Sequence, residues 1–194
     1  MNSSQTEKSD IILNLYKEKR TLFRFTDIAM LTGISDFNSL SRRLNYYVRT
    51  GKLLNPRKGI YAKEGYDLLE LACSVYSPSY ISLQYVLQGA GVLFQYDTRI
   101  TSVSYLNRTI EVDGREYQYR KIKDVALVDF KGIIRRENHV NIATPERAFL
   151  DLLYLEKEFW FDNLNPLNIE LVKETLPLYR SNALIKRVSK LLGI

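Results

Sequence analysis

Arginine and asparagine side chains recur at helical spacing between residues 37 and 50, and these two side-chain types can read DNA bases. In the major groove an arginine can form two hydrogen bonds to guanine, and an asparagine can form two to adenine. The stretch from Phe37 to Lys63 also holds seven Lys and Arg residues and no acid. This pattern predicts binding to a polyanion. The alternative is a solvated basic face that has no ligand.

The net charge of the chain is confined to its first third. Residues 1–65 contain 12 Lys and Arg against 6 Asp and Glu, which is the whole net charge of +6, whereas residues 66–194 contain 16 of each. A length of 194 residues fits one or two domains. We therefore expect a polyanion-binding domain over residues 1–65 and a second domain with a different function over residues 66–194.

Three helices are predicted in the first domain, where they would position the basic residues. Ser9 or Asp10 begins the first, whose apolar residues recur with a helical period. Thr26 is expected to cap a short second helix that ends at Gly33, where the backbone can take a positive φ. A third helix is expected over 37–50. The lengths of the second helix, the turn and the third helix match a helix-turn-helix.

The third predicted helix has two different faces. Leu40, Leu44, Tyr47 and Val48 share one side and should pack on the first two helices. The candidate DNA-contacting residues of this helix are Asn38, Ser39, Arg42, Arg43, Asn45, Tyr46 and Arg49. The alternative is that the arginines only make the helix soluble.

A cationic hairpin is predicted directly after the third helix. Two apolar pairs, at 53–54 and 60–61, flank a turn that contains Pro56 and Gly59 and carries Arg57 and Lys58. A basic hairpin that follows a helix-turn-helix is a wing, and its cations would meet DNA phosphates. The first domain is therefore predicted to be a winged helix-turn-helix.

The second domain is predicted to be α+β, with a small antiparallel sheet and C-terminal helices. Asp113-Gly114 is a strong hairpin signal between the strands 108–112 and 115–119. Thr144 and Pro145 are expected to begin a helix that runs to about residue 155. The other expected helices cover 66–76, 80–87, 168–176 and 181–192, and the other expected strands lie within 101–112, 124–130, 132–135 and 139–142.

Catalytic signatures are sparse. Cys73 and His139 are the only residues of their types, which excludes a disulfide within the chain, a Cys/His metal cluster and Cys–His catalysis. Arg147 and Asp151 are spaced as an i,i+4 ion pair, which we favour over an acid–base pair that includes Glu146. We expect no enzymatic activity, cofactor or metal. Because the sequence has neither a membrane-spanning run nor a signal peptide, we expect a cytoplasmic protein.

Several short motifs resemble the AbiEi antitoxins of bacterial type IV toxin–antitoxin systems, which are also described as regulators of viral defence by abortive infection. The most specific motif is Ala143-Thr144-Pro145-Glu146-Arg147-Ala148-Phe149-Leu150-Asp151. The others are Phe25-Thr26-Asp27-Ile28, Arg57-Lys58-Gly59-Ile60-Tyr61, Ser77-Pro78-Ser79-Tyr80-Ile81-Ser82 and Arg99-Ile100-Thr101-Ser102. The family often carries a His near the position of Gly89, and this chain has Gln88-Gly89-Ala90-Gly91 there.

The resemblance implies a winged-helix repressor of its own operon, with operator DNA as a partner. It also implies a C-terminal domain that counteracts a nucleotidyltransferase toxin, with or without direct contact. It marks Pro145, Glu146, Arg147 and Asp151 as family-motif residues. Two other hypotheses stay open. One is a winged-helix transcription factor that responds to a small molecule and has no toxin partner. The other is an enzyme that modifies the toxin, which the sparse catalytic residues disfavour.

Overall fold

The computed structural model describes residues 10–193 of a mixed α+β protein with two compact units, Met1–Glu70 and Leu71–Ile194. The division falls after Glu70 rather than after residue 65. Ser9, one of the two expected caps of the first helix, lies outside the described residues. Asp10 is the N-cap, and its carboxylate accepts hydrogen bonds from the backbone N–H groups of Ile12 and Leu13.

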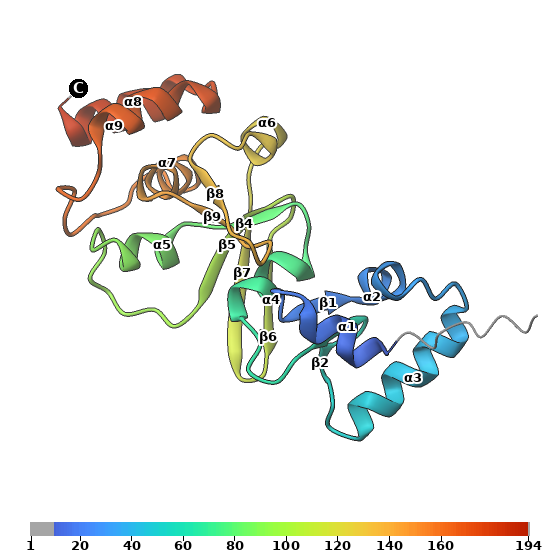
Figure 1. Ribbon diagram of the computed structural model, residues 1–194. Coiled ribbons are helices and arrows are strands. Elements are labelled where there is room, and N and C mark those ends of the chain that lie inside the picture. The colour runs from blue at the N-terminus through green and yellow to red at the C-terminus, as the bar shows by residue number, and fades with distance from the viewer. Residues whose placement is uncertain (1–9, 194) are drawn as a thin grey trace, which may run out of the picture. The chain divides into compact units, whose positions relative to one another are not determined.

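The first unit combines three helices with a three-stranded antiparallel sheet among the described residues (Figure 1). Its elements are α1 (Ile11–Lys17), β1 (Leu22–Arg24), α2 (Phe25–Thr32), α3 (Phe37–Arg49), β2 (Leu54–Arg57) and β3 (Ile60–Ala62). The strand order is β1-β3-β2. The expected hairpin is therefore present as β2 and β3, while the short strand β1 was not expected.

The second helix begins earlier than the sequence predicts. Thr26 was expected to cap it, but α2 starts at Phe25, so Thr26 lies inside the helix. The reason is that the Asp27 carboxylate accepts a hydrogen bond from the backbone N–H of Arg24 at 3.1 Å, which stabilises an earlier first turn. The helix ends as expected at Gly33, whose φ is 65°.

The core of the first unit is formed by apolar residues from all three helices and the sheet. Its buried members are Ile11, Leu15, Phe23, Ile28, Ala29, Leu40, Leu44, Leu53 and Tyr61. Tyr47 and Val48 of α3 pack against this cluster from its edge. The apolar face predicted for the third helix is therefore confirmed, and it fixes which face of α3 remains exposed.

Glu70 joins the start of β1 to the chain that follows the hairpin. This side chain is 3% exposed, and one carboxylate oxygen accepts hydrogen bonds from the backbone N–H of Thr21 at 2.8 Å and of Leu22 at 2.9 Å. The Thr21 hydroxyl donates to the same oxygen at 3.0 Å. Three donors on one buried carboxylate offset the cost of its burial.

The second unit is built on a sheet whose described strands follow the order β6-β7-β5-β4-β9-β8. Its elements are β4 (Ser79–Ile81), α5 (Gln84–Gly89), β5 (Ile100–Ser104), β6 (Arg108–Val112), β7 (Arg115–Lys121), α6 (Asp124–Val128), β8 (Ile133–Arg135), β9 (Asn141–Ala143), α7 (Pro145–Leu155), α8 (Ile169–Thr175), the 3₁₀ helix η1 (Leu176–Tyr179) and α9 (Asn182–Leu192). Helix α4 (Leu68–Val75) spans the division between the units.

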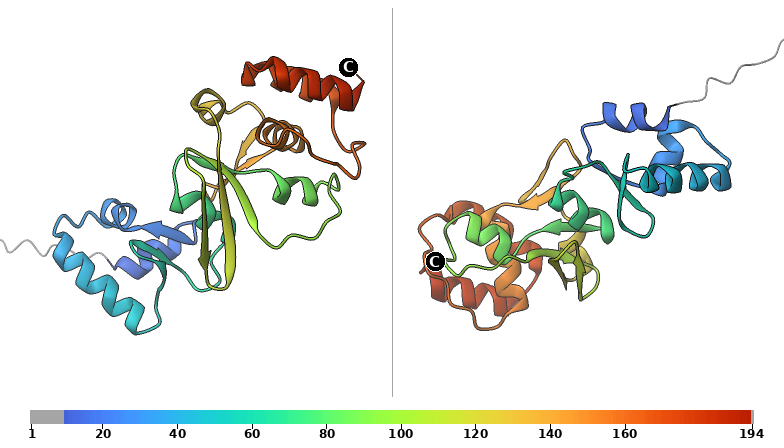
Figure 2. Two further views of the ribbon diagram at one scale, coloured as in Figure 1. Left: turned by 180° about the vertical axis from the view of Figure 1, so that it is seen from behind. Right: turned by 90° about the horizontal axis from the view of Figure 1, so that it is seen from below.

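This sheet is larger than the small antiparallel sheet expected for the second domain, and it is mixed. The β6–β7 hairpin turns at Asp113-Gly114 as predicted, and β7 then pairs in parallel with β5 (Figure 2, left). β4 also pairs in parallel with β9. Each parallel pair joins strands that do not follow one another directly in the chain, so local hairpin signals do not indicate them.

Two elements of the second unit differ in type from the prediction. The helix expected over 80–87 is wrong at its start, because Ser79–Ile81 forms the central strand β4 and the helix begins only at Gln84. The strand expected over 124–130 is wrong, because residues 124–128 form helix α6. Both segments are short apolar runs, whose periodicity does not separate a strand from a helix.

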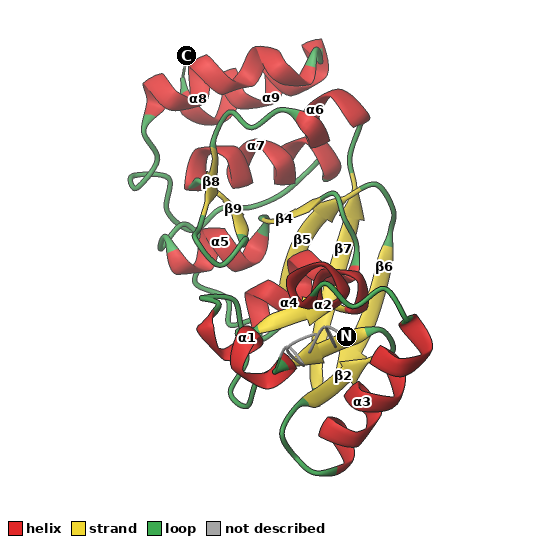
Figure 3. Cartoon of the chain, turned by 45° about the vertical axis from the view of Figure 1, so that its right-hand side comes forward, coloured by secondary structure: helices red, strands yellow, loops and turns green. Residues whose placement is uncertain are grey.

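Helix α7 is the central helix of the second unit. It lies between the β8–β9 pair on one side and helices α8 and α9 on the other (Figure 3). Every residue from Glu146 to Leu153 is buried. The burial includes the charged residues Glu146, Arg147 and Asp151 as well as the apolar ones.

Candidate nucleic-acid interface

Helix α3 is oriented by its cap and by its buried side. The Asp36 carboxylate accepts hydrogen bonds from the backbone N–H of Asn38 at 3.0 Å and of Ser39 at 3.1 Å, so the helix begins at Phe37. Leu40 and Leu44 are fully buried beneath it. With this side fixed, the residues on the far side must face solvent.

The exposed α3 face comprises Asn38, Arg42, Asn45, Tyr46 and Arg49, all of which are exposed. The Arg49 guanidinium lies 5.8 Å from the centre of the Tyr46 ring. The ring of Tyr46 is in turn 5.8 Å from that of Tyr47, in an edge-to-face arrangement. The structure therefore places on one helix face two arginines, two asparagines and a tyrosine, which are hydrogen-bonding groups suited to base edges and phosphates.

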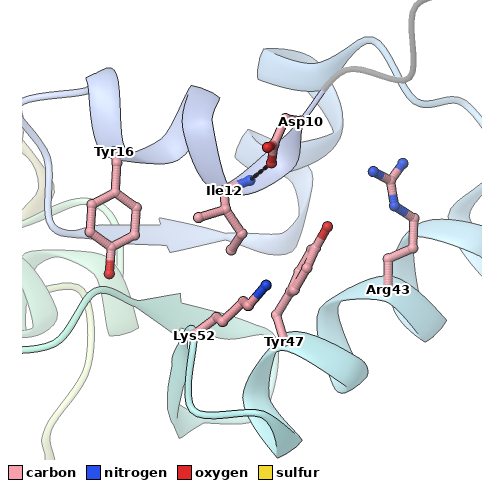
Figure 4. A pocket seen from close by; sticks show the side chains of 6 residues that line it. All are labelled: Asp10, Ile12, Tyr16, Arg43, Tyr47 and Lys52. Carbon is pink, nitrogen blue, oxygen red and sulfur yellow. Dashed lines mark hydrogen bonds between the residues drawn. The ribbon is translucent and has the colours of Figure 1, made fainter.

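Two of the predicted contact residues lie beside this face rather than on it. Ser39 and Arg43 are half-buried. Arg43 is only one residue from Arg42, but successive residues are turned by about 100° around a helix. Together with Tyr47 it lines an open pocket between α3 and α1 (Figure 4), so Arg43 does not join the exposed α3 face.

The hairpin of β2 and β3 presents the two predicted cations beside its turn. Lys58 is exposed and Arg57 is half-buried. The turn is held in shape by the Asn55 side-chain amide, which donates to the carbonyls of Arg57 at 3.0 Å and Ile60 at 2.7 Å. Gly59, at a φ of 80°, accepts a hydrogen bond from the backbone N–H of Phe25 at 3.0 Å. The hairpin is thereby attached to the first residue of α2.

The family-motif residues belong to the second unit and lie on α7. The Thr144 hydroxyl accepts a hydrogen bond from the backbone N–H of Arg147 at 3.3 Å, and Pro145 occupies the first turn, so both act as predicted. Glu146 is 5% exposed, and its carboxylate accepts a hydrogen bond from the backbone N–H of Asn168 at 3.0 Å. It does not join Arg147 and Asp151 in an acid–base pair.

Arg147 and Asp151 form the predicted ion pair, but inside the unit rather than on its surface. Their side chains are 0% exposed, with 3.3 Å between Nε and Oδ1. Asp151 also accepts hydrogen bonds from the hydroxyls of Tyr80 at 3.1 Å, Ser82 at 2.8 Å and Tyr179 at 2.6 Å. The sequence did not indicate these three partners, because they lie on β4, just after it and on η1, far from α7 along the chain.

The Arg147 guanidinium extends the network to the backbone. It donates to the Tyr80 hydroxyl at 2.9 Å, to the Lys131 carbonyl at 2.9 Å and to the Ala126 carbonyl. Burial raises the pKa values of the Tyr80 and Tyr179 phenols well above their usual range, so both remain protonated donors. These hydrogen bonds join five segments of the chain, at residues 80–82, 126, 131, 147–151 and 179. Because the side chains of Arg147 and Asp151 are fully buried, neither is accessible to a substrate.

The sequence matches no family model, and no curated protein is significantly similar to it. Residues 10–193 include no group of three or more His, Cys, Asp or Glu side chains arranged to hold a metal ion. In the same part of the chain, no helix combines the length and apolarity needed to cross a bilayer. The Cys73 thiol is half-buried, with Sγ 3.6 Å from the Asn141 carbonyl oxygen.

Proposed function

We propose that the first unit is a winged helix-turn-helix domain that binds duplex DNA, and that the chain is a transcriptional regulator. The observation that carries the proposal is the exposed α3 face, with its arginines and asparagines, followed directly by the cationic β2–β3 hairpin. The order of elements supports it, because three helices and a terminal hairpin with a third strand form the usual scaffold of a winged helix. The confinement of the net charge of +6 to residues 1–65 supports it independently.

The two elements have different roles in this proposal. Helix α3 enters the major groove, where Arg42 and Asn45 read base edges. The hairpin lies along the backbone, where Arg57 and Lys58 bind phosphates without reading sequence. In this proposal the regulator acts in the cytoplasm, because its DNA target lies there.

Selection of binding sites from random duplex DNA by the full chain, followed by a salt titration on the selected site, tests the proposal. We expect a defined sequence preference and a steep fall in affinity with salt, because each neutralised phosphate contributes roughly 0.9 to the log–log slope. A slope near zero, or a failure to enrich any sequence, would contradict it.

We propose further that the chain is an antitoxin that represses its own operon and counteracts a nucleotidyltransferase toxin. This second proposal is based on the resemblance of the sequence motifs to those of the AbiEi antitoxins. The balanced charge of residues 66–194 supports it, since that part of the chain has no electrostatic reason to bind DNA. Co-expression with a nucleotidyltransferase encoded beside its gene tests it, with the full chain and with a chain carrying Arg42→Ala and Arg57→Ala. Growth rescue by both supports an antitoxin activity separate from DNA binding.

The second candidate is a winged-helix transcription factor that responds to a small molecule and has no toxin partner. The pocket beside α3 favours it, because a ligand site on the helix that reads DNA is a simple means of regulation. A neighbouring gene for a nucleotidyltransferase would favour the antitoxin over this candidate. Failure of both chains to rescue growth, with each folded and expressed, would favour the transcription factor.

A further inference from the structure

Strand β6 forms one edge of the sheet in the second unit, and its outer side has no neighbouring strand within residues 10–193 (Figure 3). Its hairpin with β7 turns at Asp113-Gly114, where the φ angles are 50° and 72°. Beside a two-residue turn of this kind, Val112 and Arg115 exchange backbone hydrogen bonds, and the bonded pairs then alternate along the strands. The backbone N–H and C=O groups of Thr109 and Glu111 therefore point away from β7.

The other three sheet edges in the described part of the chain have features that oppose the addition of a strand. Strand β2 contains Pro56, and its register with β3 is irregular. Strands β1 and β8 have only three residues each, and in β8 the N–H of Ile133 already donates to the Phe130 carbonyl at 2.9 Å. Short strands, prolines and bulges commonly protect a sheet edge. Strand β6 has five residues in unbroken register and none of these three features, so it is the edge best suited to pairing with another strand.

The order of side chains along β6 is compatible with pairing to a second copy of itself. In an antiparallel pair centred on Ile110, Thr109 lies opposite the partner's Glu111, and Arg108 lies opposite the partner's Val112. The outward groups of Thr109 and Glu111 then face each other, so the two copies exchange four backbone hydrogen bonds. The exposed Thr109 hydroxyl donates to the exposed carboxylate of the partner's Glu111, and the two half-buried Ile110 side chains meet at the centre.

Other registers of this pair are less favourable. Centring it on Glu111 places two carboxylates opposite each other, and centring it on Arg108 places two guanidinium groups there, and like charges at such positions are destabilising. Centring it on Thr109 sets Glu111 opposite the partner's Asn107, which lies outside the strand. Centring it between two residues sets the outward backbone groups of one copy against inward ones of the other. The centre at Ile110 therefore gives a single preferred pairing with two-fold symmetry.

We propose that two copies of this chain pair through β6 and continue the sheet across a two-fold axis. A second copy is the partner that fits, because β6 carries one cation and one acid and meets no like charge in this register. The same pairing at β8 would bring the exposed residues Arg135 and Arg136 of both copies together. One strand pair is a small interface, so we expect a weak dimer with a dissociation constant on the order of 10 μM. The pairing does not involve DNA, so its test is independent of the proposed DNA binding.

Sedimentation velocity of the full chain from about 1 μM to about 1 mM, with amide hydrogen exchange at both ends of that range, tests the proposal. We expect a monomer at the low end and a dimer at the high end. The amides of Thr109 and Glu111 should exchange at least about tenfold more slowly in the dimer, because each then donates to the partner. The amide of Arg135, at the opposite edge of the sheet, should not change. A chain that stays monomeric throughout, or a dimer in which the Thr109 and Glu111 amides gain no protection, would overturn the proposal.

Proline variants test whether this edge makes the contact. Thr109→Pro removes one outward N–H and no hydrogen bond to β7, and proline is tolerated where the N–H of an edge strand faces solvent. It should weaken the dimer at least about tenfold, because the symmetric interface loses two hydrogen bonds. Arg135→Pro changes an outward N–H at the β8 edge in the same way and should leave the dimer unchanged. Equal losses in the two proline variants would contradict pairing through β6.

Charge variants at Thr109 test the register. Thr109→Lys places an ammonium group opposite the partner's Glu111 and should tighten the dimer several-fold, whereas Thr109→Glu places two carboxylates together and should weaken it. Misfolding would weaken the dimer in both variants, so opposite effects identify the contact between positions 109 and 111. Effects of the same sign in the Lys and Glu variants would show that the register centred on Ile110 is wrong and would overturn the proposal.

Discussion

Arg147 and Asp151 carry opposite charges in an interior where one unpaired charge costs far more than the pair. We expect Asp151→Asn to lower the free energy of unfolding by about 3–5 kcal/mol, because it leaves the Arg147 guanidinium buried without a counter-charge. The double variant Arg147→Met with Asp151→Leu should lose less than the sum of the two single variants. Urea denaturation of the full chain measures all of these changes. A cost below about 1 kcal/mol for Asp151→Asn would contradict the buried pair.

The two phenols of this network predict a loss of stability at alkaline pH. The pKa values of Tyr80 and Tyr179 are raised in the folded protein, and an unfolded tyrosine has a pKa of about 10. Above that pH the unfolded state releases these protons first, so the stability that is complete at lower pH falls as the pH rises, by up to about 1.4 kcal/mol per pH unit for each phenol.

Tyr179→Phe should therefore reduce the slope of unfolding free energy against pH above about pH 10. It should also cost roughly 1–2 kcal/mol near neutral pH through the lost hydrogen bond to Asp151. Tyr105→Phe, at a position that is 42% exposed, is the matched control for removal of a tyrosine hydroxyl. Equal slopes in the wild type and in Tyr179→Phe would show that this phenol does not resist ionisation.

On helix α3, the neighbouring residues Arg42 and Arg43 should behave differently because only Arg42 lies on the exposed α3 face. Arg42→Ala and Asn45→Ala should relax sequence preference and cost on the order of 1–3 kcal/mol against the selected DNA site, because each removes a base contact. Arg43→Ala should change that affinity less, since Arg43 lines the pocket beside α1. Binding assays on the selected site and on single-base variants measure the difference. A larger effect at Arg43 than at Arg42 would show that the proposed orientation of α3 in the major groove is wrong.

Single residues were predictable where their neighbours in sequence decide their environment. The helical period of α3 predicted that Arg42 and Asn45 face solvent and that Leu40 and Leu44 are buried. The burial of Asp151 was not predictable in this way, because a spacing of four residues is the same on a surface and in a core. Its three hydroxyl partners come from other elements, and only tertiary structure brings them together.

At the scale of elements, the hairpin should contribute affinity without specificity. Arg57→Ala and Lys58→Ala should weaken binding to all DNA sequences about equally, and together they should reduce the salt slope by roughly 2, because each neutralises one phosphate. Salt titrations on selected and unselected duplexes measure both effects. Asn38→Ala, on α3, is the comparison that changes no charge. If the hairpin variants altered base preference and the α3 variants did not, the roles of the two elements would be reversed.

Elements with strong end signals were predicted well, whereas two of the short strands, β1 and β4, were not. Helix α3 has Asp36 at its start, and α7 has Thr144 and Pro145, so their beginnings were correct. The strands β1 and β4 are each three residues long and depend on pairing with distant partners. Isolated short strands have no stable periodicity of their own, so no local pattern predicted them.

At the scale of the whole chain, we expect Glu70, the last residue of the first unit, to stabilise that unit when it is isolated. A fragment of residues 1–65 holds all of the net charge but lacks Glu70, and with it the three hydrogen bonds to Thr21 and Leu22. A fragment of residues 1–75 keeps that carboxylate within the whole of α4. We expect the longer fragment to be more stable than the shorter one by about 2–4 kcal/mol, because buried charge-assisted hydrogen bonds are among the stronger ones.

Thermal unfolding and DNA titration of the two fragments measure this difference. The longer fragment should bind the selected duplex with the same salt slope as the full chain, since α3 and the hairpin are intact in both. Glu70→Gln in the longer fragment is the control, because it keeps α4 and removes only the charge; its stability should fall between those of the two fragments. Equal stability of the two fragments would mean that Glu70 adds nothing to the first unit. A weaker salt slope in the longer fragment would mean that residues beyond 75 also contact phosphates, which the balanced charge of the second part of the chain argues against.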